Sequence, residues 1–199
     1  MRSVRSAAAL IGALLVGCAA PAQSLRPVTP FEPGQRVEIG LGGGGGDAGL
    51  SDRQGDFYTS YGSRAGGDAT IWGYGRWRDV LDVGALAFAG NTGFYGGGLS
   101  LRYVPVSNDS LGFAVRLEGG YAWVDVAVDF SFALDIDLWF YVSPSLGARD
   151  TATLRIPIGL AFLVTRMVGL QLEFVYGADP LTDATVDLVY GSIGLTWRL

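Results

Sequence analysis

Residues 190–199 read YGSIGLTWRL, and apolar and polar side chains alternate along them without a break. A period of two residues is the mark of a β-strand whose two faces meet different surroundings. The end of the chain is therefore predicted to be a strand with one apolar and one polar face. The apolar face carries Gly191, Ile193, Leu195, Trp197 and Leu199, and the other face carries Tyr190, Ser192, Gly194, Thr196 and Arg198.

The same alternation recurs along most of the chain. Short alternating segments are separated by turn residues, and none has the apolar period of a helix. The fold is predicted to be all-β. The candidate strands are residues 37–44, 69–77, 81–89, 97–105, 111–123, 134–147, 153–164, 168–176 and 189–199.

This count is odd, whereas bacterial single-chain membrane barrels have an even number of strands. We therefore expect eight strands, with ten as the alternative. The apolar parity changes at Trp123-Val124, which indicates a bulge or a tight turn. Residues 45–68 and 178–187 are predicted to be long exposed loops, because they are rich in turn residues.

The polar faces distinguish a membrane barrel from a soluble one. A water-facing sheet carries many charges, but only 17% of this chain is charged and it contains no Lys. We therefore predict an antiparallel up-and-down membrane β-barrel with its apolar face toward lipid. In residues 111–123, for example, the outward set is Leu111, Phe113, Val115, Leu117, Gly119, Tyr121 and Trp123. Aromatic residues near strand ends suggest interfacial girdles, namely Trp77, Tyr103, Trp123, Tyr176 and Trp197.

The first residues are predicted to be an export signal, with Arg2 and Arg5 before an apolar stretch too short to span a bilayer. Two cleavage sites compete. Residues 15–18 match a lipobox, which would remove residues 1–17 and lipidate Cys18; a cut after Ala22 would remove residues 1–22. Residues 23–36 are then a periplasmic tether and residues 37–199 the barrel domain.

The last strand also resembles the closing β-signal that barrel-insertion machinery reads, through Ser192, Gly194, Trp197 and Leu199. Leu199 replaces the more usual terminal Phe. Residues 37–199 resemble small outer-membrane barrels of the outer-membrane protein X and outer-membrane protein A transmembrane-domain type. The resemblance implies a location in the bacterial outer membrane, contact with its lipid, and recognition by the barrel-assembly machinery during biogenesis.

Several charged residues have inward parity. A buried charge is costly unless it is paired, so we predict an Arg–carboxylate network in the lumen. Its expected role is to fill and fix the interior; gating of ions or protons is the alternative. The network residues are Arg102, Arg116, Glu118, Arg155, Glu173 and Arg198, with Asp135 and Asp137 nearer a rim.

Other functions find little support in the sequence. The net charge of −5 provides no basic stripe for nucleic acid. The chain contains no His, which rules out a Ser–His nucleophile and a His-based zinc site. Residues 40–45 match a dinucleotide fingerprint, but no helix follows them. Asp179, Asp183 and Asp187 are interpreted as a solvated acidic loop in preference to a Ca²⁺ site. We predict no enzymatic activity, cofactor or metal.

The expected function is therefore that of an integral outer-membrane β-barrel with a structural, adhesive or partner-docking role. One alternative is a lipid-anchored accessory subunit of an envelope complex, with another envelope protein as its partner. A second alternative is a periplasmic lipocalin-like carrier, whose apolar face would point inward around an apolar ligand.

Overall fold

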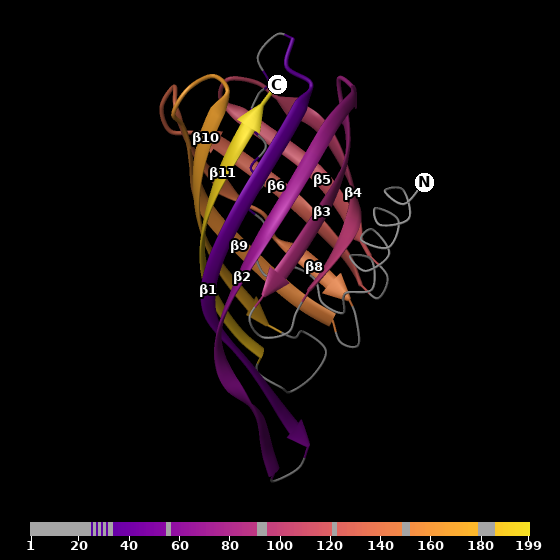
Figure 1. Cartoon of the computed structure of the whole chain (residues 1–199), viewed down its shortest axis with the longest axis vertical. Coiled ribbons are helices and arrows are strands. Elements are labelled where there is room, and N and C mark those ends of the chain that lie inside the picture. Colours follow the sequence, from indigo (N-terminus) through magenta and orange to yellow (C-terminus); the bar gives the residue numbers. More distant parts are fainter. Residues whose placement is uncertain are drawn as a thin grey trace, which may run out of the picture.

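The alternating segments form the wall of a closed antiparallel barrel in the computed structural model (Figure 1). The structure describes residues 25, 27, 29, 31, 34–54, 57–90, 95–120, 123–148, 152–178 and 186–199. Its strands are β1 (Val37–Gln54), β2 (Phe57–Arg78), β3 (Leu81–Gly90), β4 (Tyr95–Ser107), β5 (Leu111–Gly119), β6 (Val124–Ala133), β7 (Leu138–Val142), β8 (Ser145–Ala148), β9 (Ala152–Leu163), β10 (Val168–Ala178) and β11 (Val186–Arg198). Each pairs with its neighbours, and β1 pairs with β11 to close the ring.

The barrel has ten strands, because β7 and β8 are two halves of one strand. Both pair with β6 on one side and with β9 on the other. Pro144 lies between the halves and has no N–H to donate to a ladder. Ser143 keeps the connection by donating its N–H to the Pro157 carbonyl at 2.9 Å. The expectation of eight strands was wrong, and the alternative of ten is confirmed.

The strand missing from the sequence-based count is β6. Residues 111–123 were expected to form one strand, but β5 ends at Gly119 and the chain turns back. The N–H of Gly120 donates to the carbonyl of Trp123 at 3.0 Å in this turn. The change of apolar parity at Trp123-Val124 therefore marks a turn between two strands.

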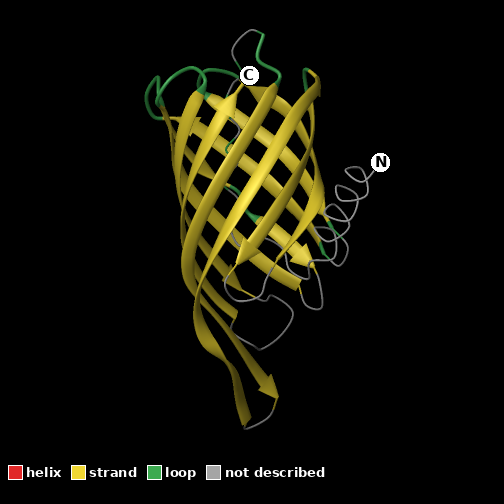
Figure 2. Ribbon diagram, in the orientation of Figure 1, coloured by secondary structure: helices red, strands yellow, loops and turns green. Residues whose placement is uncertain are grey.

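The prediction of a long exposed loop at residues 45–68 was wrong, because β1 and β2 continue through most of these residues. Their pairing runs to Gln54↔Phe57, with one register shift between Ala48 and Leu50. Together they form a long hairpin that projects past the barrel rim, at the end of the molecule away from the C-terminus (Figures 1 and 2). Of the second predicted loop, residues 179–185 lie outside the described residues, and β11 already begins at Val186.

The two ends of the barrel differ. The C-terminus and the short connections at residues 79–80, 108–110, 134–137 and 164–167 lie at one end, which we call the terminal end. The opposite end, from which the β1–β2 hairpin projects, is the hairpin end (Figure 1). In the described part of the chain, no helix has the length and apolar character needed to cross a membrane.

Outside the hairpin, the exposed large apolar residues lie on the outer face of the strands and the buried charged residues on the inner face. Ile193 is 52% exposed on the outer wall, whereas the adjacent Ser192 is 9% exposed and faces the interior. In residues 190–199, the side chains predicted to lie on one face of the strand do lie on one face in the structure. The interior is not lined by small residues alone, however, because Trp72, Tyr74, Leu86 and Phe88 form an apolar cluster inside the wall.

Candidate functional site

The barrel interior holds many of the charged and polar groups of the described chain. Strand alternation brings them there, since every second side chain of a strand points to the same face. Their burial is costly unless each charge has a partner, so their contacts determine what the interior can do.

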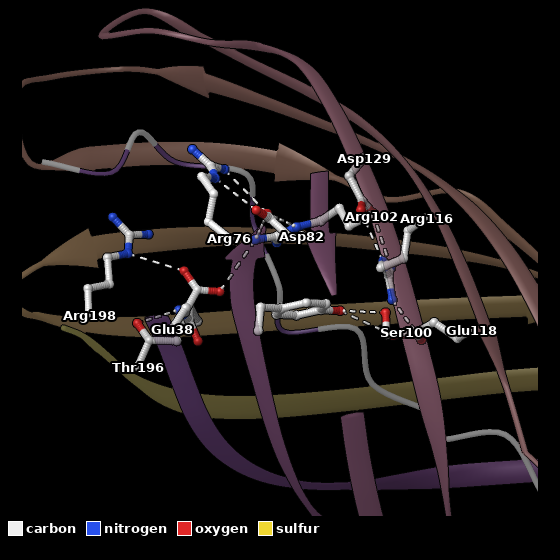
Figure 3. A network of polar contacts seen from close by, with 12 residues as sticks. Glu38, Arg76, Asp82, Ser100, Arg102, Arg116, Glu118, Asp129, Thr196 and Arg198 are labelled. Atoms are coloured by element: carbon white, nitrogen blue, oxygen red, sulfur yellow. Dashed lines mark hydrogen bonds and ion pairs between the residues drawn. The ribbon is translucent and has the colours of Figure 1, made fainter. Parts of the chain in front are cut away.

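The terminal cluster lies inside the terminal end and consists of Glu38, Arg76, Asp82, Arg102 and Arg198 (Figure 3). Asp82 joins two arginines, with Arg76 Nε at 2.8 Å and Arg102 Nη2 at 2.9 Å from its carboxylate oxygens. Glu38 accepts from Arg198 Nε at 3.2 Å and lies 3.9 Å from Arg102 Nη2. Five consecutive strands of the ring, from β11 through β1 to β4, are thereby linked along the inner wall.

The central cluster lies deeper and consists of Arg116, Glu118 and Asp129, with Tyr74 and Ser100 beside it (Figure 3). The Arg116 guanidinium donates to Glu118 Oε2 at 2.8 Å and to Asp129 Oδ2 at 3.0 Å. The Tyr74 hydroxyl lies 3.0 Å from Ser100 Oγ and donates to Glu118 Oε1 at 3.3 Å.

An aromatic ring connects the two clusters. The Arg102 guanidinium of the terminal cluster lies 4.3 Å from the centroid of the Tyr74 ring, whose hydroxyl reaches the central cluster. A cation over a ring face is attracted by the ring quadrupole, more strongly when both are desolvated. The terminal and central clusters thus form a continuous set of contacts.

Two further charges have separate partners. Arg155 Nη2 lies 2.7 Å from Asp125 Oδ2. Glu173 accepts a hydrogen bond from the Tyr141 hydroxyl at 3.1 Å and one from the backbone N–H of Leu25 at 2.7 Å. The donor of the second bond is not part of the barrel wall, because Leu25 precedes the first strand.

Four of the described residues that precede β1 lie inside the barrel. We call Leu25, Pro27, Thr29 and Phe31 the inner segment. Leu25 is 0% exposed and belongs to the apolar cluster of Trp72 and Tyr74, and Thr29 is 3% exposed. The Phe31 ring centroid lies 4.4 Å from the Arg76 guanidinium and 5.6 Å from that of Arg198. These residues belong to the stretch expected to be a periplasmic tether.

All six residues of the predicted network lie buried in the interior. Of these, Arg116 and Glu118 contact each other directly. Arg102 and Arg198 meet at Glu38, whereas Arg155 and Glu173 lie in separate contacts. Asp135 and Asp137 lie exposed in the turn at residues 134–137 of the terminal end.

Five charged residues that pair with the predicted ones or with each other were not predicted from the sequence. They are Glu38, Arg76, Asp82, Asp125 and Asp129. The signal that would have found Glu38 and Asp82 is the parity of their own strands, because each alternates with outward apolar neighbours. Asp125 and Asp129 belong to β6, the strand that was not recognised.

Trp123 was predicted on the outer wall and is buried inside, with 4% of its surface exposed. It follows the turn after β5, so its parity no longer follows that of the strand. Its ring packs edge-on against Phe88, with centroids 6.2 Å apart. The other predicted girdle residues Trp77, Tyr103 and Tyr176 are exposed, and Trp197 is half-buried.

The residues of the predicted β-signal divide between the two faces of β11. Ser192 and Gly194 face the interior, whereas Trp197 and Leu199 lie on the outer face. The Leu199 carbonyl accepts the N–H groups of Arg36 at 2.7 Å and Val37 at 2.9 Å, next to the seam between β11 and β1. Cys18 and the predicted export signal lie outside the described residues, as do Asp179 and Asp183.

The chemistry available in the interior is that of paired guanidinium and carboxylate groups. Within the described ranges, no three metal-ligating side chains come together. Residues 40–45, which match the dinucleotide fingerprint, lie within β1 and pair with β2 and β11.

Comparisons with known proteins agree with this architecture. No family model matches the chain, and no curated protein matches it. An outer membrane channel from Pseudomonas putida F1 is similar with a TM-score of 0.54 and 8% identity, over 91% of this chain and 100% of that chain. The KdgM porin is similar with a TM-score of 0.50 and 9% identity, over 81% and 99%. Neisserial surface protein A is similar with a TM-score of 0.43 and 14% identity, over 82% and 97%. At these identities the likeness is one of fold: the chain has the fold of small outer-membrane β-barrels.

Proposed function

We propose that the protein is an integral outer-membrane β-barrel with a non-catalytic role: a closed anchor that presents the β1–β2 hairpin for docking a partner. The observation that carries the proposal is the contrast between an interior filled by paired charges and a hairpin that extends beyond the rim.

The outer wall supports insertion in a membrane. It is apolar along the strands, with Ile71, Leu117 and Phe174 among its exposed residues. The strands β3 to β6 have 9 to 13 residues, close to the length a tilted strand needs to cross the hydrocarbon layer. Closure of the ring by β1 and β11 leaves no unpaired edge facing lipid.

The same contrast argues against the carrier of an apolar ligand. A lipocalin-like carrier requires apolar side chains around a sealed centre. Here Arg116 and Glu118 are buried in the interior, while Ile158 and Leu172 are exposed on the outside. Ion pairs occupy much of the interior, and Leu25 already packs against its apolar cluster, which leaves little apolar surface for such a ligand.

The hairpin supports a docking role through its open edges. The pairing of β1 with β11 ends at Leu50↔Val186, and that of β2 with β3 ends at Asp68↔Gly90. Beyond these pairs, the described hairpin residues of β1 and β2 pair only with each other. Unpaired strand edges are sites at which a partner adds a strand of its own.

Surface proteolysis of intact cells tests the proposal. We expect a protease to cut the hairpin at residues 51–60 while the barrel remains protected and keeps its heat-modifiable migration on gels. A variant in which residues 51–60 are replaced by a short turn serves as the control and should resist the cut. Protection of the hairpin in the unmodified protein, or release of the protein by high salt without detergent, would contradict the proposal.

The lipid-anchored alternative depends on Cys18. Metabolic labelling with palmitate, compared between the natural chain and Cys18→Ala, distinguishes it from the barrel alone. Label that disappears in the variant would favour the accessory subunit.

A further inference from the structure

The inner segment carries an inference beyond the docking role. We propose that Leu25, Pro27, Thr29 and Phe31 form a plug, and that the barrel becomes an ion-conducting pore when this plug leaves the lumen. While the plug is in place, the lumen is closed by a segment of the protein's own chain. The inner wall of the barrel is the site that binds this segment.

The width of the barrel calls for such a plug. A barrel of about eight strands is just wide enough for its own side chains to fill it. This barrel has ten strands, so its interior is wider than that limit. The buried Leu25 and Thr29 show that part of the added space is occupied by chain from outside the wall.

Contacts of Leu25 and Phe31 hold the plug in the lumen, and a hydrogen bond of Gln35 holds the chain between the plug and β1. Leu25 donates its N–H to Glu173 at 2.7 Å, and its side chain packs against the apolar cluster. Phe31 lies against the guanidinium groups of Arg76 and Arg198 in the terminal cluster. At the rim, Gln35 Nε2 donates to the Arg166 carbonyl at 2.9 Å.

The barrel wall does not depend on these contacts. The described residues of the inner segment belong to no strand, and the first strand begins at Val37. Arg76 keeps Asp82 and Arg198 keeps Glu38 as ion-pair partners within the wall. Departure of the plug would break the described contacts of Leu25 and Phe31, and it would expose to water the apolar cluster as well as guanidinium and carboxylate groups that water hydrates readily. A hydrated passage lined by both signs of charge conducts ions.

Conductance in planar lipid bilayers tests the proposal. We expect the full chain to stay closed and a variant lacking residues 25–33 to give discrete conductance steps. Heat-modifiable migration of the variant establishes that its barrel is folded. A folded deletion variant that stays closed would overturn the proposal, and so would a full chain that conducts as well as the variant.

A peptide of residues 23–33 provides a second measurement. Added to the deletion variant from the terminal end, it should block the conductance, whereas a peptide of the same composition in scrambled order should not. Equal effects of the two peptides would contradict a specific plug.

Cross-linking tests occupancy of the lumen directly, even if the deletion variant fails to fold. A Cβ placed at Gly194 would lie 3.2 Å from Leu25 Cδ1. We expect the pair Leu25→Cys with Gly194→Cys to react with a short thiol cross-linker in membranes. The matched control pair is Leu25→Cys with Ile193→Cys, because Ile193 faces outward. No cross-link in the first pair, or equal yields in both pairs, would overturn the plug. The hairpin experiment above is independent of these results.

Discussion

Arg116 shows how single residues stabilise the interior. Its guanidinium group contacts the carboxylates of Glu118 and Asp129 at once. Removing one partner from a buried ion pair leaves an uncompensated charge, which costs more than the pair itself contributes.

We therefore expect Arg116→Met to lower the free energy of unfolding by about 3–5 kcal/mol. The matched control is Arg166→Met, because Arg166 lies exposed in a turn, where substitutions change stability by about 0.5 kcal/mol or less. Urea titration of both variants in lipid vesicles measures the difference. Equal midpoints would show that the central cluster does not stabilise the fold.

Gly159 is a second residue whose surroundings restrict the side chain that can occupy the position. A Cβ at this position would collide with the Tyr141 ring and the Leu172 carbonyl, whereas one at Gly191 would meet nothing within 4 Å. We expect Gly159→Ala to destabilise the barrel by about 1–3 kcal/mol, the usual cost of overpacking, and Gly191→Ala to have little effect. Thermal unfolding followed by gel mobility compares the two. Similar unfolding temperatures for both variants would contradict the close packing at Gly159.

At the scale of elements, closure of the barrel depends on the end of β11. The Leu199 N–H donates to the Val37 carbonyl at 2.9 Å, and its carbonyl accepts two N–H groups in return. These backbone bonds need a residue at this position but not a particular side chain.

Deletion of Leu199 should therefore reduce the fraction of chain that assembles into a heat-modifiable barrel, while Leu199→Phe should assemble as the natural chain does. The same pair of variants tests the proposed β-signal, which requires an apolar or aromatic last residue. Normal assembly of the deletion variant would show that neither the bonds nor the signal depends on Leu199.

The elements also show what the sequence could predict. Alternation is a local property, so most strands and their faces were found from it, including all of residues 190–199. β6 was missed because the apolar alternation of residues 111–123 continues through Gly119-Gly120, so the turn at these glycines was assigned to the strand. The hairpin was missed because the Gly-rich part of β1 has few side chains to alternate, and its pairing with β2 and β11 is made by the backbone.

The interior network was harder to predict, because ion pairs join residues far apart in sequence. Arg198 and Glu38 are 160 residues apart and meet only when β11 closes on β1. Parity alone places such residues in the lumen, but only the register of the closed barrel determines which of them meet. The position of Leu25 beside Glu173 has no periodic signal in the sequence.

At the scale of the whole molecule, the position of the inner segment favours one of the two cleavage sites. Leu25 is buried in the lumen, and Cys18 lies seven residues before it, a span of at most about 25 Å. A lipid on Cys18 would thus be held within about 25 Å of a residue buried in the lumen, whereas its acyl chains require the hydrocarbon layer outside the wall.

We therefore predict that the exported chain is cut after Ala22. Mass spectrometry of the mature protein should show Gln23 as its first residue, and Cys18→Ala should leave its location and amount unchanged. A mature chain that begins with lipidated Cys18 would contradict this prediction and would require a different path for the inner segment.

The account depends on apolar side chains facing lipid and charged ones filling the lumen. Ser192 and Ile193 test it most directly, because these neighbours on one strand face opposite sides of the wall. A fluorophore attached to cysteine at either position can be measured in vesicles that contain brominated lipids. We predict strong quenching of the label at Ile193 and little quenching at Ser192. Stronger quenching at Ser192 than at Ile193 would contradict the orientation of the wall and with it the membrane barrel.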